Sequence, residues 1–208
     1  MPSWLSASAL LLVGCAQSSV APDAAVLDGA RRDGALHDAF ADTLDAADGC
    51  MPPPPPYSSL VGSTFPPLDG LFDCAGSPWS FYDVCGTPTL VAIVAGWDAR
   101  SIQVSLALTE RYLDPFPSLR VVVVVAQTED YAVADGRYCA MWRERYALED
   151  AEVVTDPEQR SSVLALPDDY GVGTVFLVDP RGEIVYRARW TAEAATILDE
   201  AVSELLRP

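Results

Sequence analysis

The chain has little of what several common kinds of site require. Its only histidine is His37, and none of its cysteines form a Cys-x-x-Cys pair, so no metal site is expected. Basic residues are also scarce, with 13 Lys and Arg against 30 Asp and Glu and a formal net charge of −17. This charge argues against nucleic acid and against an anionic membrane surface as partners. No cofactor is expected either.

The first apolar run, residues 7–13, is too short to cross a bilayer. It ends in Leu12-Val13-Gly14-Cys15, which is similar to a bacterial lipoprotein signal, although no Lys or Arg stands among the first five residues. We therefore expect a signal peptide over residues 1–15, a membrane anchor through a lipid on Cys15, and a periplasm-facing protein. An Asp directly after the lipidated cysteine would retain a lipoprotein in the inner membrane. Ala16 stands at this position instead, so the outer membrane is favoured. The alternative is a plain apolar N-terminus with a chance cysteine.

Residues 16–59 are rich in Ala and Asp and end near the run of prolines at 52–56. Few large apolar side chains are present, so the segment cannot bury enough surface to offset its ordering entropy. Leu36, Phe40 and Leu44 recur at helical spacing and indicate at most one short amphipathic helix, and His37 is expected to be solvated. We predict a disordered, flexible tether that holds a domain, residues 60–208, off a membrane.

Strand-like and helix-like patterns alternate through the domain, which predicts a three-layer α/β sandwich. Ile102, Leu106 and Leu113 are expected on the inner face of a helix that ends before Pro115. The expected strands are residues 79–82, 89–95, 121–125, 152–155, 174–179 and 183–187. The other expected helices are residues 138–146, residues 158–164 and a final helix capped by Thr191.

The apolar strand from Thr89 breaks at Gly96, where a helix is expected to begin. At such a corner, an aromatic residue followed by Cys-x-x-Cys places a low-pKa thiolate on the helix N-terminus, as thiol-disulfide exchange requires. Here Trp97 is followed by Asp98-Ala99-Arg100-Ser101, so Asp98 and Ser101 occupy both sulfur positions. Asp98 can cap the helix, but it cannot form a mixed disulfide.

Ordered motifs in the domain resemble the thioredoxin-like superfamily, in particular the TlpA/ResA and redoxin (AhpC/TSA) branch. They are residues 61–66, 90–97, 121–126, 154–157 and 170–184. The resemblance implies a thioredoxin-like fold and the activity of a thiol-disulfide oxidoreductase or peroxide reductase outside the cytoplasm. It also implies paired cysteines where Asp98 and Ser101 stand, so the Cys-x-x-Cys motif is degenerate. A cis-proline is implied where residues 173–175 read Gly-Thr-Val, and its loss suggests a remodelled docking loop.

The cysteines other than Cys15 are Cys50, Cys74, Cys85 and Cys139. In an oxidising compartment they are expected to form disulfides. Cys74 can close a short loop with Cys85, or Cys139 can pair with one of the two. Structural disulfides or a buried thiol are favoured over a relocated redox pair.

Two functions follow from these patterns. The first is a tethered thioredoxin-like module that has lost dithiol chemistry and binds an extracytoplasmic protein through its corner groove. The second is an oxidoreductase or antioxidant enzyme that uses Cys74, Cys85 or Cys139, whose thiols must then have a pKa-lowering environment of their own. We favour the first, because Asp98, Ser101 and the missing cis-proline depart from the family together.

Overall fold

The computed structural model describes residues 56–84, 86–161, 165 and 171–207. The expected signal peptide, Cys15, the helix at residues 36–44, the solvated His37, Cys50 and Cys85 lie outside the described residues, as does part of the helix expected at residues 158–164. None of the described helices is both long and apolar enough to span a membrane.

One mixed sheet organises the described residues. Its seven strands lie in the order β2-β1-β5-β4-β3-β6-β7. The central strands β3, β4 and β5 are parallel, whereas β1 and β2 at one side and β6 and β7 at the other pair antiparallel. The strands are β1 Leu71–Asp73, β2 Pro78–Trp79, β3 Thr89–Ala95, β4 Arg120–Gln127, β5 Glu152–Thr155, β6 Thr174–Val178 and β7 Ile184–Arg189.

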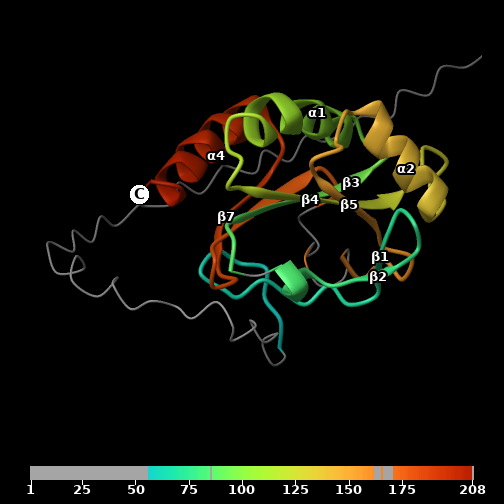
Figure 1. Cartoon of the computed structure of the whole chain (residues 1–208), viewed down its shortest axis with the longest axis horizontal. Helices are drawn as coiled ribbons and strands as arrows, with labels where there is room; N and C mark the ends of the chain where they lie inside the picture. Colours follow the sequence, from blue (N-terminus) through green and yellow to red (C-terminus); the bar gives the residue numbers. More distant parts are fainter. Residues whose placement is uncertain (1–55, 85, 162–164, 166–170, 208) are drawn as a thin grey trace, which may run out of the picture. The chain divides into compact units, whose positions relative to one another are not determined.

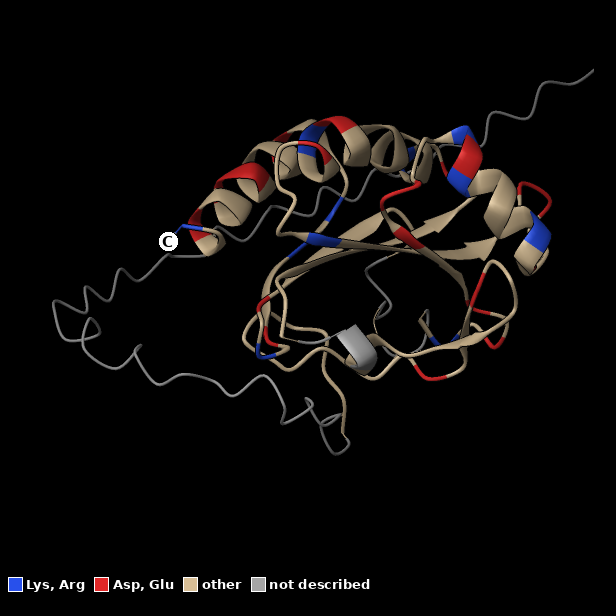
Figure 2. Cartoon of the chain, viewed as in Figure 1, with Lys and Arg blue, Asp and Glu red and all other residues tan. Residues whose placement is uncertain are grey.

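Helices cover one face of this sheet, and the N-terminal part of the domain covers the other (Figure 1). On the helical face lie α1 (Ala99–Leu108) with its π-helical extension η2 (Thr109–Leu113), α2 (Gly136–Arg145) and α4 (Ala192–Leu205). The opposite face carries the short 3-10 helix η1 (Phe81–Val84). Charged residues gather on the helices and loops, while the strands are mostly uncharged (Figure 2). The predicted three-layer α/β sandwich is confirmed.

The buried strand β3 divides the core into two clusters. Successive side chains of a strand point to opposite faces, so Leu90, Ala92 and Val94 pack beneath the helices with Tyr112 and Trp142. Val91, Ile93 and Ala95 pack on the other face, in a cluster that also contains the aromatic rings of Phe65, Phe81 and Phe176. Both faces are therefore apolar, as the continuous run in the sequence predicts.

The inner face of α1 differs from the prediction. Ile102 and Leu106 are exposed, and the buried positions are Ser101, Val104, Ser105 and Leu108, which are again spaced as one helical face. A polar contact accounts for this difference. The Ser101 hydroxyl accepts a hydrogen bond from the backbone N–H of Ala95, so the face of α1 that carries Ser101 is turned towards the sheet. Leu113 is partly buried and packs against the helix-side core, as expected.

Most of the remaining boundaries follow the sequence closely. The helix expected from residue 158 begins only at Arg160, because residues 157 and 158 form a turn. Residues 79–82 are not a strand, because β2 ends at Trp79 and η1 begins at Phe81. Ser59, at the end of the segment expected to be a tether, is buried, and its carbonyl and hydroxyl oxygens accept hydrogen bonds from Arg187 of β7. The hairpin of β6 and β7 and the Thr191 cap of α4 are confirmed.

Candidate functional site

The corner between β3 and α1 is closed by a carboxylate and a hydroxyl. Asp98 caps α1, and its Oδ2 accepts hydrogen bonds from the Ser101 backbone N–H at 2.7 Å and from the Ser101 Oγ at 2.9 Å. The Ser101 Oγ accepts in turn from the backbone N–H of Ala95 at 3.0 Å. Asp98 is 7% exposed and Ser101 is 0% exposed. The two residues that stand at the expected sulfur positions thus hold each other and the end of β3.

The loop before β6 lies directly against this cap. A Cβ atom built on Gly173 would come within 2.8 Å of the Asp98 Oδ2 and within 2.8 Å of the Arg100 Cβ. Gly173 also has a positive φ of 78°, which glycine adopts without strain. Its N–H donates to the carbonyl of Ile93 and its carbonyl accepts from Trp190, which fixes the loop on both sides. The segment expected in place of a cis-proline therefore does face the Asp98 and Ser101 positions.

The start of α2 also contacts the corner. A Cβ on Gly96 would meet the Tyr138 hydroxyl at 2.1 Å and the Glu129 backbone nitrogen at 2.7 Å, so only glycine fits there. Burial raises the pKa of Tyr138 above its ordinary value, and the Glu129 carboxylate raises it further. The same hydroxyl holds the pKa of Glu129 below its usual range. The Tyr138 hydroxyl therefore stays protonated beside the corner.

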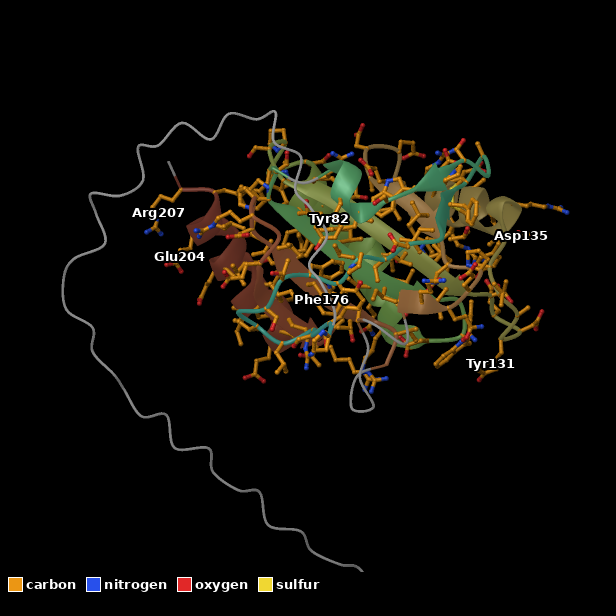
Figure 3. All side chains as sticks on the ribbon, turned by 90° about the horizontal axis from the view of Figure 1, so that it is seen from below. Tyr82, Tyr131, Asp135, Phe176, Glu204 and Arg207 are labelled. Carbon is orange, nitrogen blue, oxygen red and sulfur yellow. A yellow bond between two sulfur atoms is a disulfide. The ribbon has the colours of Figure 1, made fainter. Side chains whose placement is uncertain are left out.

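Exposed apolar side chains surround the corner. We call Trp97, Tyr131, Val133 and Met141 the corner surface, and each of them is substantially exposed. Trp97, 39% exposed, stacks on Tyr131, 67% exposed, with ring centroids 5.1 Å apart. Tyr131 lies at the same end of the molecule as Asp135, far from Glu204 and Arg207 of the α4 end (Figure 3).

The corner surface continues into a groove. Its lining includes Val133, Tyr138 and Met141, and its volume is about 640 Å³. The Trp97 Nε1–H donates to the Gln127 side chain at 2.8 Å, and Gln127 pairs with Val133. Aromatic and apolar groups next to a concave surface are typical of protein-binding sites. Trp97 stands at a recognisable strand-to-helix corner. Tyr131 and Val133, in the loop after β4, and Met141, in α2, have no sequence signal beyond being apolar.

The cysteines of the described residues lie in a different part of the sheet. Cys74, at the end of β1, forms a disulfide with Cys139 of α2, with Cα atoms 5.2 Å apart. Of the two partners that the sequence allows for Cys74, Cys85 and Cys139, the structure therefore shows Cys139. The remaining cysteines, Cys15, Cys50 and Cys85, belong to the undescribed residues.

The chemistry available at the corner follows from this arrangement. Asp98 and Ser101 offer oxygen atoms that are already engaged by hydrogen bonds and are buried, so a substrate reaches neither as a nucleophile. Within the described residues, no group of three His, Cys, Asp or Glu side chains is placed to hold a metal ion. What the corner presents to a partner is the apolar corner surface.

Comparison with known proteins identifies the fold. No family model matches the chain, and no curated protein does. Among solved structures, a putative protein disulfide isomerase from Bacteroides thetaiotaomicron is similar, with a TM-score of 0.59, 16% identity, and coverage of 73% of this chain and 93% of that one. A thiol peroxidase from Chromobacterium violaceum gives a TM-score of 0.55, 16% identity, and coverage of 74% and 90%.

A third similar structure is that of a secreted Mycobacterium tuberculosis disulfide oxidoreductase, with a TM-score of 0.52, 14% identity, and coverage of 66% of this chain and 97% of that one. At these identities the likeness shows the fold alone. The chain has a thioredoxin-like α/β fold.

Proposed function

We propose that this protein is a thioredoxin-like binding module of the TlpA/ResA and redoxin type whose corner no longer performs dithiol chemistry. The proposal rests on two features that occur together at the corner between β3 and α1. Asp98 and Ser101 fill the sulfur positions and bind each other, while Trp97 and Tyr131 remain stacked and exposed beside them. The corner keeps a surface for contact after losing its redox atoms.

The partner is an extracytoplasmic protein that places apolar side chains on the corner surface. Stacked Trp97 and Tyr131 offer large, rigid contact area at a small cost in side-chain entropy, as interface anchors do. The Asp98 cap and the close contacts of Gly96 and Gly173 support this surface from below. Since the support is internal to the fold, the surface is formed before the partner arrives.

Site-directed photo-crosslinking tests this proposal. A photoreactive residue at Tyr131 should give a discrete adduct with one protein in the cell envelope of the native host, whereas the same residue at exposed Val185 of β7 should not. Replacing Trp97 with Ala should weaken the captured interaction at least tenfold, about 1.4 kcal/mol, because the stacked anchor is lost. Equal adducts at both positions, or an adduct that survives Trp97→Ala unchanged, would contradict the assignment of the corner surface.

The proposal includes export and tethering through Cys15. Its support is the Leu12-Val13-Gly14-Cys15 sequence followed by an acidic, Ala-rich segment. Labelled fatty acid should be incorporated into the full chain expressed in its host, and Cys15→Ala should abolish the label and release the protein from the membrane fraction. Cys50→Ala, in the same segment, is the matched control and should change neither. Membrane retention in the Cys15→Ala variant would show that the anchor is elsewhere.

A further inference from the structure

A shallow groove runs past the disulfide, on a part of the molecule separate from the corner surface. Its volume is about 410 Å³, and it lies between the β1 and β2 hairpin, α2 and β5. Its walls include Asp73, Cys74, Trp79, Arg143 and Glu152. Cys74 therefore belongs to the wall of a groove that a peptide can enter, with an aromatic side chain beside it.

The two cysteines of the disulfide differ in exposure. Cys74 is partly exposed and lines the groove, whereas Cys139 is 0% exposed and belongs to the core cluster beneath the helices. Both Sγ atoms lie 3.4 Å from the carbonyl oxygen of Val153. An attacking thiolate must approach along the S–S axis and can reach only an accessible sulfur. In the folded protein that sulfur is Cys74.

The walls of the groove carry charges of both signs. Arg143 follows Cys139 by one helical turn and so shares its face of α2. Of the two carboxylates in the walls, Glu152 accepts hydrogen bonds from the Trp79 Nε1–H at 2.6 Å and from Arg120. Asp73 accepts from the backbone N–H groups of Ala75 and Ser77, and these hydrogen bonds lower its pKa. Both carboxylates keep their negative charge, and Arg143 is the wall residue whose positive charge attracts an approaching thiolate.

Cys139 is the leaving group when Cys74 is attacked. It lies at the end of the first turn of α2, and its N–H donates to the carbonyl of the capping residue Asp135. The dipole of the helix N-terminus favours negative charge on this sulfur during the exchange, while its burial opposes it. Once protonated, the Cys139 thiol can donate to the Val153 carbonyl oxygen that already lies beside it.

We propose that Cys74–Cys139 is an exchangeable disulfide that accepts electrons from a dithiol bound in the groove. One thiolate of the donor attacks the Cys74 Sγ, the Cys74–Cys139 bond breaks, and Cys139 leaves as a thiolate that takes up a proton. The second thiol of the donor then attacks its own sulfur in the mixed disulfide and releases Cys74, which is protonated in turn. The donor dithiol is oxidised to a disulfide, and this protein is reduced by two electrons.

The asymmetry of the pair makes it a receiver of reducing equivalents rather than a reductase. Cys139, in the first turn of α2, is fully buried, while partly exposed Cys74 follows β1 outside any helix start. Attack on a foreign disulfide needs the accessible thiol to be the activated one. The inference concerns a different groove from that of the corner surface. The helix α2 contributes residues to both grooves, but neither proposal depends on the other.

Native-state reduction with glutathione tests the inference. The oxidised full chain is incubated with increasing glutathione, quenched in acid and digested before aspartates, which separates Cys74 on residues 73–82 from Cys139 on residues 135–149. We expect the rate to rise linearly with glutathione and the mixed disulfide on Cys74 to exceed that on Cys139 by roughly tenfold or more, because only Cys74 is accessible. A rate fixed by global unfolding and independent of glutathione, or adducts mainly on Cys139, would overturn the proposal.

A pair of arginine variants isolates the role of the groove. Arg143→Gln should lower the second-order rate constant for glutathione by about threefold, the effect of one nearby unit charge in a water-like dielectric. It should leave the rate with a neutral phosphine unchanged. Arg145→Gln is the matched control, because Arg145 is on the same helix but pairs with Glu129 and does not line the groove. If both variants slow the reaction with glutathione equally, Arg143 has no role in the mechanism. The same holds if Arg143→Gln slows the reactions with glutathione and with the phosphine equally.

Discussion

Replacing Cys139 with Ser lowers the free energy of unfolding by about 4 kcal/mol, since the disulfide closes a loop with a sequence separation of 65 residues. Closing so long a loop removes many conformations from the unfolded chain, and this is the main way in which a disulfide stabilises. The bond also fastens the β1 and β2 hairpin, at one side of the sheet, to α2. Denaturation by guanidinium chloride, monitored by tryptophan fluorescence, measures the loss.

Replacement of the other cysteine of the disulfide, Cys74, provides the control. Cys74→Ser should destabilise by a similar amount, and the double variant Cys74→Ser with Cys139→Ser should be little worse than either single variant, because only one covalent bond is lost. Wild-type protein reduced before the measurement should approach the same stability. Losses that add in the double variant would mean that the two cysteines stabilise through separate contacts, contrary to the structure.

Replacing Asp98 with Ala lowers the free energy of unfolding by about 2–3 kcal/mol. The substitution removes the cap of α1 and leaves the N–H and the hydroxyl of Ser101 without their acceptor in a buried place. Asp98→Asn keeps an acceptor oxygen and should recover a large part of the loss. Thermal and denaturant unfolding of the three proteins measure it.

Asp135 provides the matched control for this prediction. It caps α2 with the same geometry, accepting from the Tyr138 N–H at 2.8 Å, but it lies in an exposed place and holds no buried hydroxyl. Asp135→Ala should therefore cost only about 1 kcal/mol, the ordinary value of a cap. If the Asp98→Ala and Asp135→Ala variants lose the same stability, Asp98 is only a helix cap and the buried bond to Ser101 contributes nothing.

The fold was largely predictable because its central strands are continuous apolar runs. Residues 89–95 and 121–125 are too apolar to face water on either side, and both are buried in the structure. The face of α1 was not predictable from apolar spacing, because two buried serines, Ser101 and Ser105, take inward positions that apolar residues usually fill. Ser105 is satisfied there by donating to the Ser101 carbonyl and accepting from the Trp142 indole N–H.

The candidate site was predictable only in part. The Asp98 cap follows from a capping residue placed after Gly96, and the structure shows that bond. The choice of Cys139 as partner of Cys74 depends on how α2 packs beside the end of β1, a contact between segments 65 residues apart in sequence. The stacking of Tyr131 on Trp97 likewise depends on a loop conformation, with Tyr131 at a positive φ of 63°, that local sequence does not determine.

Both proposals explain why the protein is not expected to catalyse dithiol exchange. At the corner, the accessible surface has no sulfur atom at the Asp98 and Ser101 positions. At the groove, sulfur is present, but the thiol with the favourable helix position is Cys139, which is fully buried. The protein is thus expected to bind a partner at one place and to accept electrons at another, without catalysing dithiol exchange at either.

The most direct test of this account is the reduction of insulin by dithiothreitol with substoichiometric amounts of the purified domain. The account predicts a rate equal to that of dithiothreitol alone, both for the wild-type protein and for Cys139→Ser. Acceleration by the wild-type protein that disappears in Cys139→Ser would contradict it, because the redox site would then have moved to the disulfide and the protein would be an oxidoreductase.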